Sequence, residues 1–254
     1  MPQWDLGKGM DVMETAGTIQ FSAVRPANLG ASEYTLVAIL CDISGSVYPF
    51  KDKLRNCIKK VIDCCKRSDR SENLMIAFWT FNDIVEEVHG FRELDSIDVD
   101  DYEELMTSGL TALHDAVHTG IDAIATYANT LAEQDFDVNA CVYIITDGDD
   151  NHSSRDASDV KKLTSAAMRS EKLESLVSVL IGLKDAGVTD DNWAENVGRH
   201  LSDFQGEAGL TKYVDVGDAT ESQLAQLGEF ISQSISSQSQ RIPQPKHSFR
   251  KLNF

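Results

Sequence analysis

Near-continuous apolar runs of strand length recur along this 254-residue chain, at residues 35–42, 74–81, 140–146 and 176–183. Such runs are typical of strands that are buried on both faces of a parallel sheet. Between and after them, apolar residues recur at helical spacing over residues 54–65, 113–128, 160–168, 192–204 and 224–235. The alternation predicts an α/β fold with a doubly wound, mostly parallel sheet flanked by helices, of the general Rossmann-like type.

Shorter apolar segments predict further strands at residues 18–24 and 212–216. Residues 84–88 follow a turn signal, which predicts that they pair antiparallel with the preceding strand. Pro49 suits the first turn of the first long helix, because its fixed φ fits there and its missing N–H costs nothing. Gly206 and Gly209 are expected to break the helix that covers residues 192–204.

The chain divides into three parts by composition. Residues 1–33 form an N-terminal extension of mixed character, and residues 34–237 contain the regular alternation of strands and helices. Residues 238–254 form a tail with two prolines, four Lys or Arg residues and no acidic residue. Such a tail is either a disordered terminus or a basic peptide that docks on an acidic surface.

The charge balance narrows the possible partners. The chain has 41 Asp and Glu residues against 23 Lys and Arg, which gives a net charge of −18. This field repels phosphate backbones and anionic membranes, so we expect neither a nucleic-acid nor a membrane partner. The sequence has no apolar run of transmembrane length and no secretory signal, and it predicts a cytoplasmic protein. Its five cysteines are odd in number and lack CxxC spacing, so we expect reduced core thiols.

Oxygen-bearing side chains follow the predicted strands and precede one predicted helix. Asp42, Ser44 and Ser46 come at the end of the run 35–42, Thr111 precedes the helix 113–128, and Asp147 follows the run 140–146. In an open α/β sheet, ligands bind at the carboxyl ends of the strands. Two carboxylates and three hydroxyls suit Mg²⁺, with Mn²⁺ or Ca²⁺ as alternatives. Five side chains leave a coordination position for an outside carboxylate, and Gly45 is expected to permit the bend between the two serines.

Three motifs in order carry a family resemblance: Asp42-Ile43-Ser44-Gly45-Ser46, then Gly109-Leu110-Thr111, then Thr146-Asp147-Gly148. Together they resemble the metal-ion-dependent adhesion site (MIDAS) of von Willebrand factor A (vWA) domains, and the resemblance covers residues 34–237. It implies that Ser44, Ser46 and Thr111 are direct or switchable metal ligands. It also implies that Asp42 and Asp147 contact the metal through water, while Asp149 and Asp150 add negative charge nearby.

The resemblance implies a protein-binding module without catalytic activity, in which a partner's Asp or Glu completes the metal shell. Intracellular proteins of this kind are often adaptors, some of them working with MoxR-type AAA+ ATPases or in stress-response systems. Two alternatives stay open. The chain could be an assembly subunit that binds through its basic tail and keeps a purely structural metal, or a metal-dependent hydrolase. His114 and His118 have the i, i+4 spacing of zinc ligands, but no third ligand is evident.

Overall fold

The computed structural model of the chain describes residues 9–15, 19–184 and 191–239. Thirteen regular elements build it: β1 (Met10–Glu14), β2 (Gln20–Val24), β3 (Glu33–Asp42), α1 (Lys51–Lys66), β4 (Leu74–Phe81), β5 (Val85–Glu93), α2 (Leu113–Ala132), β6 (Asp137–Thr146), α3 (Ala157–Arg169), β7 (Ser175–Lys184), α4 (Asp191–Ala208), β8 (Lys212–Asp218) and α5 (Glu221–Ser239). The predicted tail lies mostly outside the described residues, which end at 239.

The strands form one sheet with the order β1-β2-β5-β4-β3-β6-β7-β8. Strands β4, β3, β6, β7 and β8 run parallel, and β5 pairs antiparallel with β4, as residues 84–88 predicted. The N-terminal extension contributes β1 and β2, which form an antiparallel pair at one edge of the same sheet. The fold is therefore the doubly wound, mostly parallel α/β sheet that the alternating pattern predicted.

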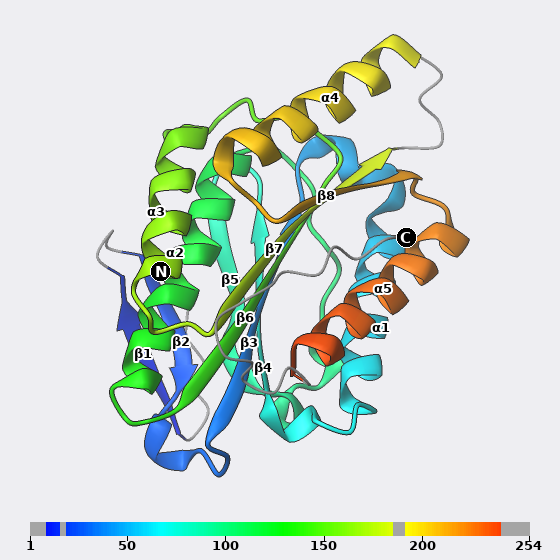
Figure 1. Cartoon of the computed structure of the whole chain (residues 1–254). Coiled ribbons are helices and arrows are strands. Elements are labelled where there is room, and N and C mark those ends of the chain that lie inside the picture. The colour runs from blue at the N-terminus through cyan, green and yellow to red at the C-terminus, as the bar shows by residue number, and fades with distance from the viewer. Residues whose placement is uncertain (1–8, 16–18, 185–190, 240–254) are drawn as a thin grey trace.

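Helices cover both faces of the sheet (Figure 1). One face packs against α2, α3 and the C-terminal half of α4, in a core that includes Leu113, Ile121 and Phe204. The other face packs against α1 and α5, through side chains such as Leu54 and Ile231. Strands β3 and β6 are buried along almost their whole length because helices cover them on both sides. No helix in the described ranges is long and apolar enough to cross a membrane.

Three local expectations differ from the structure. Pro49 lies inside a short 3₁₀ helix, Gly45–Phe50, and α1 begins only at Lys51. Gly206 does not break α4, which continues to Ala208, whereas Gly209 ends it with a φ of +69°. Strand β1 was not predicted, because a single exposed edge strand of five residues has too little apolar alternation to be recognised.

The order of the strands creates a switch point between β3 and β6. From β3 the chain crosses through α1 to β4 on one side, and from β6 it crosses through α3 to β7 on the other. The two connections lie on opposite faces of the sheet, so they diverge and leave space at the carboxyl ends of these two strands. Ligands bind at such points in open α/β sheets, and both predicted carboxylates lie there.

Candidate metal centre

Asp42 is the last residue of β3 and is completely buried. Its Oδ1 accepts a 2.7 Å hydrogen bond from the backbone N–H of Ser44, and its Oδ2 accepts a 2.6 Å bond from Thr146 Oγ1. Burial raises the pKa of the Asp42 carboxyl, and the hydrogen bonds from Thr146, Ser44 and the backbone of Asp147 oppose that shift. The carboxylate is thus fixed in place, at the end of the central strand.

Ser44, Ser46 and Asp147 form a connected set of oxygens. Ser44 Oγ lies 3.1 Å from Ser46 Oγ, and Ser46 Oγ donates a 2.9 Å hydrogen bond to Asp147 Oδ1. Ser44 and Asp147 are buried, whereas Ser46 is exposed. The set therefore joins the loop after β3 to the loop after β6 and reaches the surface at Ser46.

Thr111 is held beside this set by a two-point contact with Asn151. Its N–H donates a 2.8 Å hydrogen bond to Asn151 Oδ1, and its carbonyl accepts one of 3.0 Å from the Asn151 N–H. The Thr111 side chain is buried, and a methyl group built on Gly148 would lie 3.7 Å from Thr111 Oγ1. The hydroxyl therefore lies next to the backbone that follows Asp147.

Gly109 gives the third loop its path. Its φ is +78°, and a Cβ there would lie 2.6 Å from Asp83 Oδ2. The Gly109 carbonyl accepts a 3.2 Å hydrogen bond from the Gly45 N–H, which ties the third loop to the first. Gly45 itself has no positive φ, so the expected need for glycine at that bend is wrong; the requirement is at Gly109.

Asp149 and Asp150 direct their carboxylates to other partners. Asp149 Oδ2 lies 2.6 Å from His200 Nδ1, and Asp150 Oδ1 accepts hydrogen bonds from the His114 N–H and from Ser153 Oγ. Both carboxylates thus order the loop between β6 and α3.

The oxygen spacing fits a small divalent ion. Adjacent oxygens in an octahedral shell at about 2.1 Å from Mg²⁺ lie about 3.0 Å apart. The distance of 3.1 Å between Ser44 Oγ and Ser46 Oγ matches such an edge. The 2.9 Å hydrogen bond from Ser46 to Asp147 holds that carboxylate where it would contact the ion through water. Among the described residues no three His, Cys, Asp or Glu side chains could hold a metal ion together, so the candidate centre depends on its hydroxyls. That all five residues are ligands stays a prediction.

Of the two histidines that suggested zinc, His114 has contacts that account for it structurally. The His114 ring stacks on Phe204 with centroids 4.3 Å apart, and its Nδ1 lies 3.2 Å from the carbonyl oxygen of Arg155. Desolvation and the nearby Arg155 charge lower the pKa of His118. These contacts place His114 in the packing between α2, α4 and the loop before α3.

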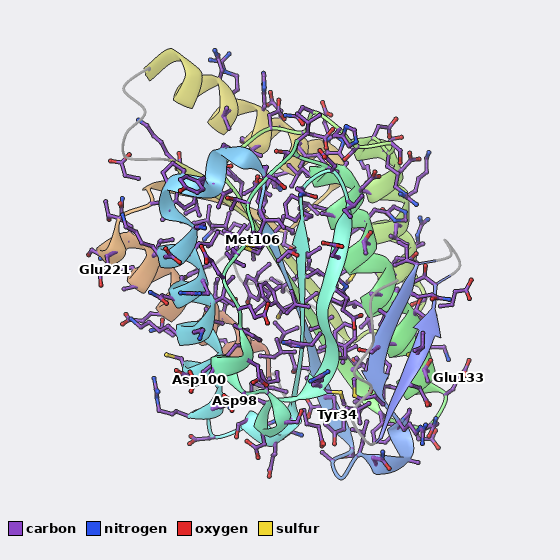
Figure 2. The ribbon with its side chains drawn as sticks, turned by 180° about the vertical axis from the view of Figure 1, so that it is seen from behind. Tyr34, Asp98, Asp100, Met106, Glu133 and Glu221 are labelled. Carbon is purple, nitrogen blue, oxygen red and sulfur yellow. The ribbon has the colours of Figure 1, made fainter. Side chains whose placement is uncertain are left out.

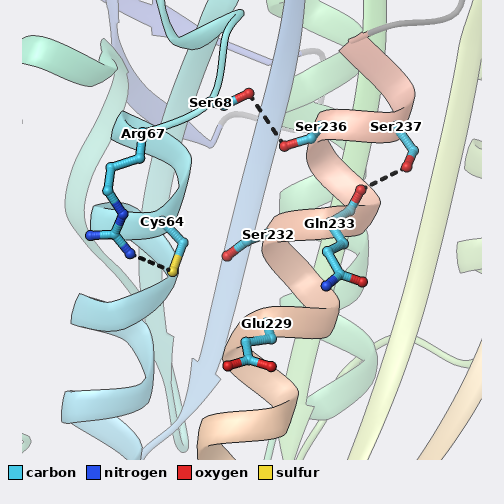
Figure 3. A pocket seen from close by; sticks show the side chains of 8 residues that line it. All are labelled: Cys64, Arg67, Ser68, Glu229, Ser232, Gln233, Ser236 and Ser237. Carbon is cyan, nitrogen blue, oxygen red and sulfur yellow. Dashed lines mark hydrogen bonds between the residues drawn. The ribbon is translucent and has the colours of Figure 1, made fainter.

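A separate hollow of about 530 Å³ lies between α1 and α5, away from the candidate centre (Figure 3). Its polar wall includes Cys64, whose Sγ accepts a 3.1 Å hydrogen bond from Arg67 Nη2, and a contact of 3.3 Å between Ser68 Oγ and Ser236 Oγ. None of the candidate ligands lines it. All five cysteines, each within the described residues, are free thiols, and four of them lie in the core as expected, whereas Cys64 is only half-buried.

Thr146 was named in the sequence analysis within the third motif but was given no role, and Asn151 was not singled out there. Thr146 donates a hydrogen bond to the Asp42 carboxylate, and the Asn151 side chain accepts one from the Thr111 N–H. Thr146 could have been found from the register, because Cys41 pairs with Ile145 and the next residues, Asp42 and Thr146, must then be neighbours. Asn151 lies in an irregular loop and gives no periodic signal.

Solved structures share this architecture. The PilB minor pilin from Streptococcus sanguinis matches with a TM-score of 0.53 and 16% identity, over 86% of this chain and 65% of that one. The pilus adhesin SpaC from Lactobacillus rhamnosus GG matches with a TM-score of 0.58 and 10% identity, over 85% of this chain and 31% of that one. Proximal thread matrix protein 1 from the mussel byssus matches with a TM-score of 0.51 and 19% identity, over 81% of this chain and 47% of that one.

These matches show the fold. The chain has a vWA-like α/β architecture, as the resemblance predicted, and it spans less than two thirds of each of these three chains. No protein-family model and no curated protein sequence matches the chain.

Proposed function

We propose that the chain is a protein-binding module that uses a divalent cation to capture a carboxylate from a partner protein. The observation that carries the proposal is the convergence of three loops on one set of oxygens at the switch point of the sheet. Asp42 and Asp147 supply charge, and Ser44, Ser46 and Thr111 supply neutral oxygens. A shell with only two protein carboxylates leaves the ion electrophilic toward another anion.

The buried and exposed members of the centre have different tasks. Ser44, Thr111 and Ser46 would hold the ion, while Asp42 and Asp147 would position it through water. The ion would supply Lewis-acid attraction for an incoming carboxylate. Because Ser46 is exposed and the other four residues are buried, the incoming group would approach on the Ser46 side. We propose Mg²⁺ as the ion, with Mn²⁺ or Ca²⁺ as substitutes.

We propose further that the chain is a cytoplasmic adaptor without catalytic activity of its own. The adhesin and matrix-protein names of two structural relatives support a binding role over an enzymatic one. A MoxR-type AAA+ ATPase is the partner to test first, since the sequence resemblance implies it.

A pull-down from the source lysate tests this function. The full chain is immobilised with Mg²⁺ or with EDTA, and retained proteins are identified by mass spectrometry. We expect partners that are lost in EDTA and lost with Ser44→Ala combined with Asp147→Ala. Asp149→Asn is the matched control, because that carboxylate pairs with His200 outside the ligand set. Capture that survives the double substitution but fails when residues 240–254 are deleted would instead support binding through the tail.

A further inference from the structure

Exposed apolar side chains gather around the candidate centre. In the described part of the chain, seven large apolar residues are exposed: Val12, Tyr48, Ile84, Val88, Met106, Leu110 and Met168. Four of them, Tyr48, Ile84, Met106 and Leu110, lie on the loops that carry or adjoin the candidate ligands. We call these four residues the apolar rim. Met106 is 75% and Tyr48 66% exposed, whereas Val12, Val88 and Met168, which lie outside the rim, are each less than half exposed.

Backbone hydrogen bonds hold the loops of the rim together. The Ser108 N–H donates to the Ile43 carbonyl at 2.9 Å, which attaches the loop of Met106 and Leu110 to the loop that begins the candidate site. The Ala112 N–H donates to the Asn82 carbonyl at 2.8 Å, which attaches the loop of Met106 and Leu110 to the turn that contains Ile84. Tyr48 follows Ser46 by two residues within the 3₁₀ helix. Met106 is labelled in Figure 2 and belongs to the segment that precedes α2.

The charges beside the rim are negative. Asp83 is exposed and accepts a 2.6 Å hydrogen bond from the Leu110 N–H, and Glu103 is exposed three residues before Met106. Lys51 lies over the Tyr48 ring, 5.1 Å from its centroid, but it is also paired with Glu104. The carboxylates of Asp83 and Glu103 therefore repel additional acidic groups on a partner and attract basic ones.

We propose that the apolar rim selects a partner segment with one Asp or Glu beside a bulky apolar side chain, flanked by Lys or Arg and not by further acidic residues. This inference rests on the proposed function, because the carboxylate needs the metal. The apolar neighbour would bury Met106 and Leu110, which otherwise stay in water. The basic flank would meet Asp83 and Glu103. Exposed apolar patches rimmed by polar groups are typical of protein-interaction sites.

Panning of a phage-displayed library of random dodecapeptides tests the inference. The full-length chain is immobilised in Mg²⁺, bound phage are eluted with EDTA, and the recovered sequences are compared with those from Met106→Ser combined with Leu110→Ser. Met168→Ser is the matched control, since Met168 is an exposed apolar residue on α3, outside the rim. Unchanged unfolding temperatures would show that both variants are folded.

We expect EDTA-eluted peptides with a single carboxylate, an apolar neighbour and a basic flank, and about tenfold weaker binding of the best peptide to the rim variant. Carboxylate peptides without apolar neighbours, bound equally by the rim variant, would overturn the inference and leave the proposed function intact. A library that yields no EDTA-dependent peptide would overturn both. Enrichment of peptides with several acidic residues would contradict the charge argument and the inference with it.

Discussion

Thr146 Oγ1 donates a 2.6 Å hydrogen bond to Asp42 Oδ2, across the parallel pair of β3 and β6. Both side chains are buried, so this bond fixes a carboxylate in the interior where water cannot replace the donor. It connects the two strands at the switch point of the sheet. The orientation of Asp42, and through Ser44 the start of the first loop, depends on a threonine that is not itself a candidate ligand.

Thr146→Val removes this donor while keeping the volume of the side chain. We expect a loss of about 1–3 kcal/mol in the free energy of unfolding, because the buried Asp42 carboxylate loses a partner. Affinity for divalent cations should fall as well. Urea unfolding and Mn²⁺ titration measure the two effects. Thr130→Val is the control, since that hydroxyl bonds only a carbonyl within α2. Equal effects of the two substitutions would contradict this role for Thr146.

Gly109→Ala should destabilise the loop before α2. The residue has a φ of +78°, and its new Cβ would lie 2.6 Å from Asp83 Oδ2. We expect a loss of more than about 1 kcal/mol and weaker metal binding, because the loop also carries Thr111.

Gly206→Ala is the matched comparison, because Gly206 lies within α4 and a Cβ there meets nothing within 4 Å. That substitution should stabilise the protein by about 0.5–1 kcal/mol. Thermal unfolding of the two variants shows whether each substitution raises or lowers the stability of the protein. The same sign for both variants would contradict the geometry of the loop at Gly109.

Two groups on β5 predict opposite effects of pH on stability. Burial raises the pKa of Glu87 to about 7, whereas burial lowers the pKa of His89 to about 4. The folded state therefore favours protonated Glu87, and stability from this group is lost as the pH rises from 4.5 to 7. Neutral His89 is favoured in the folded state, and stability from it is lost as the pH falls from 6.5 to 4.

The two effects oppose each other in the wild type, so single variants must reveal them. Relative to wild type, Glu87→Gln should gain up to about 2–3 kcal/mol between pH 4.5 and 7. His89→Phe should gain relative to wild type as the pH falls from 6.5 to 4. Urea unfolding at several pH values measures both differences. Curves that run parallel to the wild type across these ranges would contradict the assigned burial of the groups.

Cys64 should be the cysteine that reacts in the folded protein. Cys41, Cys57, Cys65 and Cys141 are buried, and burial raises the pKa of Cys57 and Cys65 to about 12. Cys64 is half-buried and lines the open hollow between α1 and α5 beside the guanidinium of Arg67 (Figure 3), so a reagent can reach its thiol. Mass spectrometry after brief maleimide treatment should show one label, absent in Cys64→Ser. Labelling of two or more sites at the same rate would contradict the packing.

The sequence predicted the sheet and its helices because the fold is built from strands buried on both faces. Runs such as 35–42 and 140–146 have few polar positions, so their pattern specifies parallel strands with little ambiguity. Strand β1 escaped prediction because it lies at an edge, where three of its five residues are exposed. Pro49 was misplaced because a 3₁₀ turn and the first turn of an α-helix accept proline equally well.

The candidate site was predictable where its residues follow regular strands. Asp42 and Asp147 come at strand ends, so the topology alone places them at one edge of the sheet. Their supporting contacts were less accessible. Asn151 and Asp83 act through irregular loops, and the direction of the Asp149 side chain toward His200 depends on the packing of α4. Such contacts depend on tertiary structure and leave no periodic signal in the chain.

Titration of the purified full-length chain with Mn²⁺, followed by electron paramagnetic resonance, tests the central claim most directly. The account predicts one bound Mn²⁺ per chain that Mg²⁺ displaces, a spectral change when acetate is added as a carboxylate probe, and loss of binding in Ser44→Ala combined with Asp147→Ala. Asp149→Asn should bind as the wild type does. Absence of a displaceable Mn²⁺ site in the folded protein, or binding that the double substitution leaves unchanged, would contradict the account.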